Sequence, residues 1–309
     1  MAATTDVPTL VINADDFGLS EGINRGILEA FHAGALRSAS LMVTMPAFGD
    51  AVCRAKAAGP ALGIGLHFTL TAGRPLTRAL SLVDRDTGDF VGPSTVLVRA
   101  LTGRIRHNEV EDECAAQIAR AREAGIELTH LDGHHHVHLA PGIRGAVQRV
   151  LVAERIPAVR RPVERLYGIP KWQRRLPERM LIAMLSRGGG LERAGILTTD
   201  YFVGSTLPGA RDFHSGLVRV LDALQRGTTE LMVHPGYVSG PLPGADPYTA
   251  QREVELRALT APAVLQRLHS GRIRLAHFGE LGAAVPSFDV RQSIATRGES
   301  AEPSSRVGG

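Results

Sequence analysis

The amino-acid sequence predicts an α/β fold, an irregular TIM-like (β/α) barrel with a parallel sheet inside and helices outside. Apolar runs of strand length alternate along the chain with segments of helical period, which is the pattern of βα units. Seven or eight such units fit into about 280 residues, and that number suits a closed barrel better than an open sheet. A doubly wound open sheet is the alternative, although no GxGxxG motif follows the first strand to indicate a dinucleotide site.

The elements follow one another in a regular order. The apolar run TLVIN predicts the first strand over 9–13. Ser20 has the position of a helix N-cap, and the helix that it starts is expected to end near Gly34. Further strands are expected over 40–44, 62–70 (ending near His67), 127–132, 158–160, 199–203, 229–234 and 273–278. Further helices are expected over 48–58, 108–124 and 143–154 and between the later strands, and 71–93 is expected to be a long loop over the C-terminal face of the sheet.

Composition and length indicate a globular protein. The chain has 309 residues, of which 44% are hydrophobic and 21% charged, so it can bury its own core. We expect one barrel domain over residues 1–285, with a basic amphipathic insertion at about 164–193. Residues 286–309 are rich in Ser, Gly and Arg, and we expect them to form a disordered tail.

Two further features bear on location and redox state. No apolar stretch approaches the roughly 18 residues of a membrane span, and residues 1–9 have no signal-peptide features, so a cytoplasmic protein is expected. The two cysteines, Cys53 and Cys114, exclude a disulfide framework, and we interpret both as small core residues of helices.

The positive charge is local. The whole chain carries a net charge of +4, whereas residues 151–194 contain ten basic and four acidic residues. The remainder of the chain is therefore slightly acidic. Because no nucleic-acid-binding motif is present and aromatic residues are few, binding to nucleic acid is not expected.

Polar residues at the ends of the predicted strands form the strongest functional signal. Asp15 and Asp16 follow the first strand, His67 ends the third, and His234 ends a late one. A run of histidines follows Asp132 at the end of another strand: His134, His135, His136 and His138. In a parallel βα barrel all of these ends open on one face, where active sites lie.

One carboxylate and two imidazoles from separate strands suit a catalytic divalent metal ion with positions left open for water. We predict Asp16, His67 and His134 as its ligands. Adjacent side chains of a strand point to different sides, so Asp15 is expected to do a different job, as general base. His234 could protonate a leaving amine.

Each of these residues also has an ordinary structural interpretation. The Asp pair could cap a helix, although Ser20 is the better cap, and His67 alone could be a hydrogen-bonded core histidine. The histidine run could lie at the surface. His135, His136 and His138 need not be ligands and could instead hydrogen-bond the ligands or contact a substrate.

Four segments together resemble the YdjC-like carbohydrate deacetylases, a family that includes chitooligosaccharide deacetylases and the deacetylase associated with hopanoid biosynthesis. They are VINADDFGLS (11–20), GLHFTLTAGRPL (65–76), THLDGHHHVH (129–138) and ELMVHPGYV (230–238), and they are spread over almost the whole chain. The resemblance implies a polysaccharide-deacetylase-like barrel and metal-dependent removal of N-acetyl groups from amino sugars.

Carried over by motif, the resemblance implies Asp16, His67 and His134 as metal ligands and Asp15 as base. It implies His234 as acid by analogy with the wider deacetylase group. It also implies an arginine that orients Asp15 through a bidentate pair, either Arg160 or its neighbour Arg161. The donor set accepts magnesium, zinc or another divalent ion, so the metal is not decided.

The substrate and the competing functions stay open at this stage. TTDYFVG (198–204) resembles the hopanoid-associated branch, and apolar residues at near-helical spacing over 171–185 could form a helix at a membrane surface and suit a lipid-linked amino sugar. An ordinary barrel-covering helix is the alternative. A homodimer is compatible with the family. Competing functions are another metal-dependent barrel hydrolase (an amidohydrolase or phosphoesterase, which usually carries HxH at the first strand) and a non-catalytic sugar-binding relative.

Overall fold

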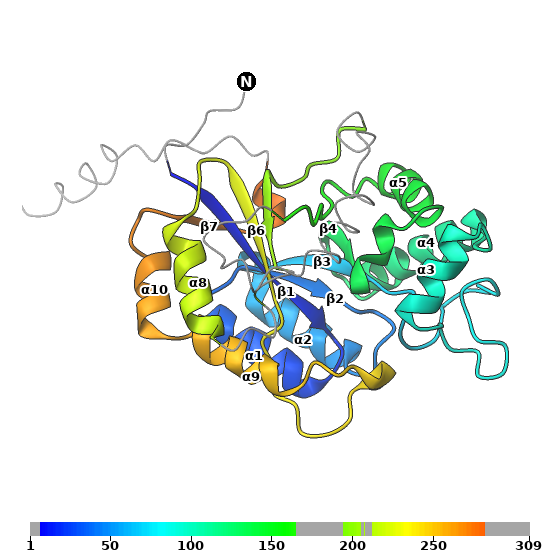
Figure 1. Ribbon diagram of the computed structural model, residues 1–309, viewed down its shortest axis with the longest axis horizontal. Helices are drawn as coiled ribbons and strands as arrows, with labels where there is room; N and C mark the ends of the chain where they lie inside the picture. Colours follow the sequence, from blue (N-terminus) through cyan, green and yellow to red (C-terminus); the bar gives the residue numbers. More distant parts are fainter. Residues whose placement is uncertain (1–6, 165–193, 205–206, 208–211, 282–309) are drawn as a thin grey trace, which may run out of the picture.

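A parallel β-sheet forms the centre of the molecule (Figure 1). The computed structural model describes residues 7–164, 194–204, 207 and 212–281. Within these residues the strands run in the order β4-β3-β2-β1-β6-β5, and β7 pairs with β1. Their bounds are β1 Thr9–Phe17, β2 Ser38–Leu41, β3 Gly63–Phe68, β4 Leu128–Gly133, β5 Tyr201–Val203, β6 Thr228–Val233 and β7 Arg274–Ala276.

The sheet forms a half-barrel, and an irregular segment bridges its two edges. Val159 forms an isolated parallel bridge with Leu131 of β4, and Glu164 forms another with Phe202 of β5. The segment 158–164 therefore lies between the two edge strands. This closure distinguishes the fold from a doubly wound open sheet and confirms the predicted irregular TIM-like α/β barrel.

Helices cover the outside of the sheet (Figure 1). They are α1 Glu21–His32, α2 Phe48–Ala58, α3 Pro93–Leu101, α4 His107–Glu123, α5 Ile143–Ala153, α8 Phe213–Asp222, α9 Ala250–Leu259 and α10 Pro262–Leu268. Short 3-10 turns are η1 Gly59–Ala61, η2 His134–Leu139, η4 Pro243–Ala245 and η5 Phe278–Glu280. None of the described helices is long and apolar enough to cross a membrane.

Local sequence explains where α1 begins and ends. The Ser20 side chain accepts a hydrogen bond from the Ile23 backbone N–H, as expected of an N-cap. Gly34 follows the helix with φ +75°, a conformation that favours glycine. Ser20 is thus the cap of α1, which leaves Asp15 and Asp16 free for another role.

Several sequence-based expectations were wrong. Residues 158–160 form isolated bridges instead of a regular strand, and the second strand begins and ends earlier than predicted, at Ser38–Leu41. Helix α3 was not expected at the end of the long loop. Cys53 lies in α2 but is exposed, because it faces away from the sheet, whereas Cys114 is buried in α4 as predicted. The amphipathic stretch 171–185 and the tail 286–309 lie outside the described residues.

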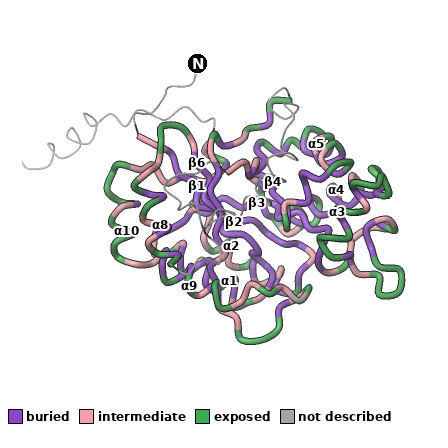
Figure 2. Tube along the Cα trace, viewed as in Figure 1, coloured by how far each residue is buried: buried purple, intermediate pink, exposed green. Residues whose placement is uncertain are grey.

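The two faces of the sheet differ in chemistry. On β1, Leu10, Ile12 and Ala14 join the large apolar core under the helices. The alternate residues, Val11, Asn13 and Asp15, face the other side. That inner face carries a small apolar cluster of Val11, Ala158, Ala276 and Phe278 at its N-terminal end. Towards the C-terminal ends of the strands the buried inner side chains are polar, and Figure 2 shows that this central region is buried.

Candidate active site

A bulge at the end of β1 brings two consecutive carboxylates into one cavity. The pairing of β1 with β2 is irregular between Ala14 and Phe17, and Asp16 has φ +66°. Such bulges turn side chains away from strict alternation and are common beside active sites. Asp15 and Asp16 therefore line the same cavity, although sequence alternation predicted that they point to different sides.

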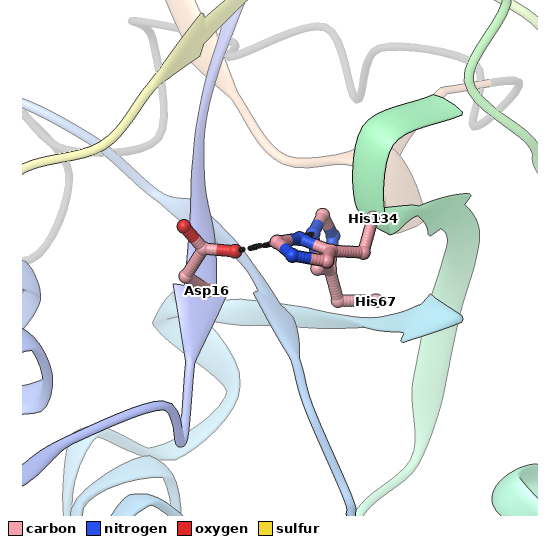
Figure 3. Close-up of side chains that lie close together, drawn as sticks. All are labelled: Asp16, His67 and His134. Carbon is pink, nitrogen blue, oxygen red and sulfur yellow. Dashed lines mark hydrogen bonds and ion pairs between the residues drawn. The ribbon is translucent and has the colours of Figure 1, made fainter. Parts of the chain in front are cut away.

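Three side chains from three strand ends converge at this cavity (Figure 3). Asp16 is the last residue but one of β1, His67 is the last but one of β3, and His134 opens η2 directly after β4. Asp16 Oδ1, His67 Nε2 and His134 Nδ1 form a triangle whose edges are all 3.3 Å. Metal bonds of about 2.1 Å at tetrahedral angles place ligand atoms about 3.4 Å apart, so the triangle has the size of a metal site.

The donor atoms also have the chemistry that a cation needs. Asp16 Oδ1 is buried and makes no hydrogen bond within the described part of the chain. His67 Nδ1 lies 2.8 Å from Asp132 Oδ1. A proton on Nδ1 would donate to Asp132 and leave the Nε2 lone pair directed at the triangle, which is the usual carboxylate–histidine–metal arrangement. The three residues therefore fit a divalent ion.

The charged groups around the triangle favour a positive charge within it. Burial alone lowers the pKa of His67, but the nearby carboxylates of Asp132, Asp16 and Asp15 outweigh burial and raise the pKa to about 10. Burial raises the pKa of Asp16, but Arg252 and the two imidazoles outweigh it and hold that pKa well below its usual range. A proton or a metal ion would satisfy the same electrostatic demand.

Arg160 holds Asp15 in place. Its Nη1 and Nη2 donate to the two Asp15 oxygens at 2.6 Å each, a bidentate pair. The same fully buried guanidinium lies 2.9 Å from Asp132 and donates to Glu230 at 2.7 Å. Of the two arginines that the resemblance left open, the structure places Arg160, not Arg161, against Asp15.

The site carries an excess of negative charge. Five carboxylates lie around two arginines: Asp15, Asp16, Asp132, Glu230 and Asp246 around Arg160 and Arg252. Even with Glu230 neutral, the four aspartates carry two more negative charges than the two arginines compensate. A protonated His67 would offset part of this excess, and a bound divalent cation would neutralise it.

His234 follows β6 and lines the same cavity. Its backbone N–H donates to Glu255 Oε2 at 2.6 Å, and its ring lies 5.2 Å from the Tyr248 ring. The Tyr248 hydroxyl in turn donates to the other Glu255 oxygen. Helix α9 therefore fixes His234 through Glu255, while the ring nitrogen Nδ1 keeps no partner among the described residues.

The other three histidines of the run do different things. His135 lies 2.9 Å from the Thr71 hydroxyl and lines the cavity, as does His136. His138 Nε2 lies 3.2 Å from the Arg160 carbonyl and is buried behind the site. His135 and His136 both have φ +55°, so the backbone of η2 is strained beside the triangle.

The cavity has a volume of about 570 Å³, within the range of roughly 300–1,000 Å³ for small-molecule sites. Apolar side chains line the cavity beside the polar residues already described: Pro93, Val96, Leu97, Val137, Leu139, Ala140 and Met232. This mixed lining suits an uncharged polar molecule with apolar faces.

Sequence reasoning missed several residues of this site. The sequence marks Asp132 only as the end of a strand, because its pairing with His67 depends on the register of β4 against β3, which the sequence does not give. Glu230, Asp246 and Arg252 gave no motif signal of their own. Glu230 stands within an otherwise apolar strand, and a carboxylate at such a position is expected to be buried and paired with a cation. This pattern could have indicated that Glu230 pairs with an arginine.

Fold and site together define a class, an α/β-barrel protein with an Asp-His-His group at the C-terminal ends of its strands. The chain belongs to the family of YdjC-like proteins, whose profile matches residues 9–270.

Relatives that are named carbohydrate deacetylases match most of the chain. It is 35% identical over 278 residues to a carbohydrate deacetylase of Brevibacillus brevis, covering 88% of this chain and 99% of that one. It is 34% identical to the human carbohydrate deacetylase, with 91% and 93% of the two chains covered. A solved structure from Enterococcus faecalis V583, provisionally described as a cellobiose-phosphate cleavage protein, superposes with a TM-score of 0.69 at 23% identity over 89% of this chain and 99% of that one. At that identity the likeness bears on the fold alone.

Proposed function

We propose that this protein is a metal-dependent carbohydrate deacetylase, a hydrolase that removes N-acetyl groups from an N-acetylated amino sugar. The observation that carries the proposal is the triangle of Asp16, His67 and His134 in a cavity that also holds Asp15 and His234. Membership of the YdjC-like family and relatives named carbohydrate deacetylases support the same activity.

In this proposal Asp16, His67 and His134 hold one divalent ion, magnesium or zinc. Such an ion polarises a carbonyl oxygen and lowers the pKa of water. Asp15 accepts the proton of the water molecule that attacks the acetamide carbonyl. The bidentate pair with Arg160 keeps Asp15 oriented while it does so.

His234 is the proposed general acid. The amine is a poor leaving group unless it gains a proton as the C–N bond breaks. His234 lines the cavity, its Nδ1 has no partner in the described ranges, and its backbone is fixed by Glu255, so the imidazole can hold and deliver a proton.

Two other functions are less well supported. A non-catalytic sugar-binding relative would not need both a candidate base and a candidate acid, yet Asp15 and His234 both line the cavity. Amidohydrolases and phosphoesterases of the barrel type usually place an HxH pair on the first strand, whereas β1 carries Asp15 and Asp16 near its C-terminal end.

We propose either an oligosaccharide or a glycolipid, such as an N-acetylglucosaminyl hopanoid, as the substrate. The glycolipid alternative comes from the segment TTDYFVG (198–204), which resembles the hopanoid-associated branch, and from the apolar spacing of residues 171–185, which lie outside the described residues. In that alternative the protein, expected to be cytoplasmic, associates peripherally with a membrane surface. Failure to bind vesicles that contain anionic lipids would exclude the membrane association. The family resemblance is also compatible with a homodimer, which light scattering would test.

The activity is tested by acetate release. A panel containing diacetylchitobiose and an N-acetylglucosaminyl lipid is incubated with the protein and Mg²⁺ or Zn²⁺, with Asp15→Asn as the matched control. Acetate release that the control abolishes supports deacetylation and ranks the substrates. No release from any sugar with either metal would refute the proposed function.

A further inference from the structure

Four side chains that line the cavity keep a buried polar atom without a hydrogen-bond partner among the described residues. These atoms are Asp16 Oδ1, His136 Nδ1, His234 Nδ1 and Arg252 Nη1. Asp16 Oδ1 belongs to the triangle, and a histidine nitrogen can accept or donate according to its tautomer. Arg252 differs, because a guanidinium stays charged and only donates. Its Nη1 therefore requires an acceptor that the described residues do not supply.

The position of Arg252 is fixed by its other nitrogens. Nη2 donates to Asp16 Oδ2 at 2.7 Å and to Asp246 Oδ2 at 2.6 Å. Nε donates to the Tyr248 carbonyl at 2.7 Å. The side chain is 1% exposed. Because the guanidinium is planar and two of its three nitrogens are held, the third nitrogen is held as well.

Arg252 also links the candidate metal ligand to α9. Its Nη2 donates to Asp16 Oδ2, which does not belong to the triangle. Only Oδ1 of Asp16 is therefore available to a metal ion in the triangle. One helical turn further along α9, Glu255 holds the backbone of His234. The same face of α9 thus holds both Asp16 and the backbone of His234, and Nη1 of Arg252 has no acceptor within the described part of the chain.

A buried charged donor is costly to leave unpaired, and in a functional cavity a ligand commonly completes its hydrogen bonding. The local charges indicate the kind of ligand. The guanidinium already faces two carboxylates, Asp16 and Asp246, so its positive charge is compensated. Those two carboxylates would repel a third anion, whereas they would not repel a neutral oxygen.

We propose that Arg252 Nη1 donates a hydrogen bond to a neutral oxygen of the bound substrate, either a sugar hydroxyl or the acetamide carbonyl. Arg252 is then a substrate-binding residue in addition to its contact with Asp16. This inference rests on the proposed function, because the neutral oxygen belongs to an N-acetylated sugar.

The experiment uses Arg252→Lys. Lysine keeps the charge near Asp16 and Asp246 but has no second nitrogen at the position of Nη1. Both Arg252→Lys and the control Arg257→Lys are placed in the Asp15→Asn background, so that sugar binding is measured without turnover. Arg257 lies on the same helix, is 68% exposed and pairs with Glu253. Calorimetry then gives the affinity of each variant for Zn²⁺ and, with Zn²⁺ bound, for diacetylchitobiose.

We expect Arg252→Lys to weaken sugar binding by about 10-fold to 100-fold, the loss of a hydrogen bond from a charged donor. Its Zn²⁺ affinity should stay within about 3-fold of the parent, because one charged donor near Asp16 is retained. The Arg257→Lys control should change neither affinity. In the otherwise unmodified enzyme, an effect on KM would indicate a sugar hydroxyl as the partner, and an effect on kcat would indicate the acetamide oxygen.

Unchanged sugar affinity in Arg252→Lys overturns the inference. So does a sugar affinity that falls only in parallel with Zn²⁺ affinity, because Arg252 would then act solely through Asp16. If Arg252→Lys does not fold, Arg252→Gln replaces it, since the amide keeps a neutral donor toward Asp16. If the unmodified enzyme releases no acetate and the Asp15→Asn parent binds no sugar, the proposed function itself is refuted, and this inference with it.

Discussion

Replacing Arg160 by methionine should strongly destabilise the protein. The Arg160 side chain is fully buried and contacts three carboxylates, which belong to Asp15, Asp132 and Glu230. The contacts to Asp15 are both 2.6 Å, and those to Asp132 and Glu230 are 2.9 and 2.7 Å. Arg160→Met keeps a similar apolar volume but leaves these carboxylates without their shared cation.

The expected loss follows from burial. Breaking a buried ion pair by removing one partner costs about 3–5 kcal/mol, because the remaining charge stays buried and unpaired. Such a loss is a large part of the roughly 5–15 kcal/mol that stabilises a typical domain. Part of it should be recovered in the double variant Arg160→Met/Asp132→Asn, because Asp132, whose pKa Arg160 and His67 hold well below its usual range against the effect of burial, then no longer leaves an unpaired buried charge.

Urea unfolding followed by circular dichroism at pH 7 measures both variants. Arg149→Met is the matched control, since Arg149 pairs with Glu111 at the surface and its side chain is 58% exposed. Exposed pairs contribute about 0.2–1 kcal/mol. A loss in Arg160→Met no larger than in this control would refute the idea that the guanidinium compensates the buried carboxylates.

Three further predictions concern the remaining carboxylates of the site. Asp15→Asn should keep its metal content but lose about 100-fold to 10,000-fold in turnover, since an amide cannot accept the proton; near-normal rates of acetate release would place the base elsewhere. Asp16→Ala should lose bound metal and activity together, and full metal content by elemental analysis would reject Asp16 as a ligand. Burial raises the pKa of Glu230 from 4.5 to about 7 against the opposing effect of Arg160, so the folded state holds this proton more tightly than the unfolded state. The stability from this group is therefore present below pH 4.5 and is lost as the pH rises through 7, a difference of roughly 3 kcal/mol. Glu230→Gln should flatten the decline in unfolding free energy between pH 5 and 8, and an equal decline in both proteins would contradict the assignment.

Local patterns account for what the sequence could predict of this site. Asp15, Asp16 and His67 stand at the ends of apolar runs, and parallel strands bring such ends to one face. The bulge that turns Asp15 and Asp16 toward one cavity has no such local signal, because it depends on how β1 pairs with β2. Strand alternation was therefore the wrong rule at this one position, although different roles for the two residues are still proposed.

Partners that are far apart in the sequence could not be predicted in the same way. Arg160 meets an aspartate 145 residues away, and Arg252 meets one 236 residues away. Each lies outside a regular strand end: Arg160 in the irregular segment 158–164 and Arg252 inside α9. Only the closure of the half-barrel and the packing of α9 bring them to the carboxylates.

The alternation of the strands holds one clue about function that does not depend on any motif. Parallel sheets covered by helices on both faces are apolar on both. Here the alternate residues that face inward are polar or small on most strands: Asn13 and Asp15, Ser38 and Ser40, Gly63, Gly65 and His67, His130 and Asp132, and Glu230.

A sheet with such an inner face cannot pack a helix or a second apolar layer against it, because the buried polar groups would lose water without gaining partners. It must curve so that the polar groups meet one another, as Asn13 meets Asp15, Ser40 and Asp132. Gly65 makes this possible on β3, since a Cβ there would lie 2.2 Å from the His130 ring. The pattern that forces the half-barrel therefore also fills its interior with the groups that hold the candidate metal ligands.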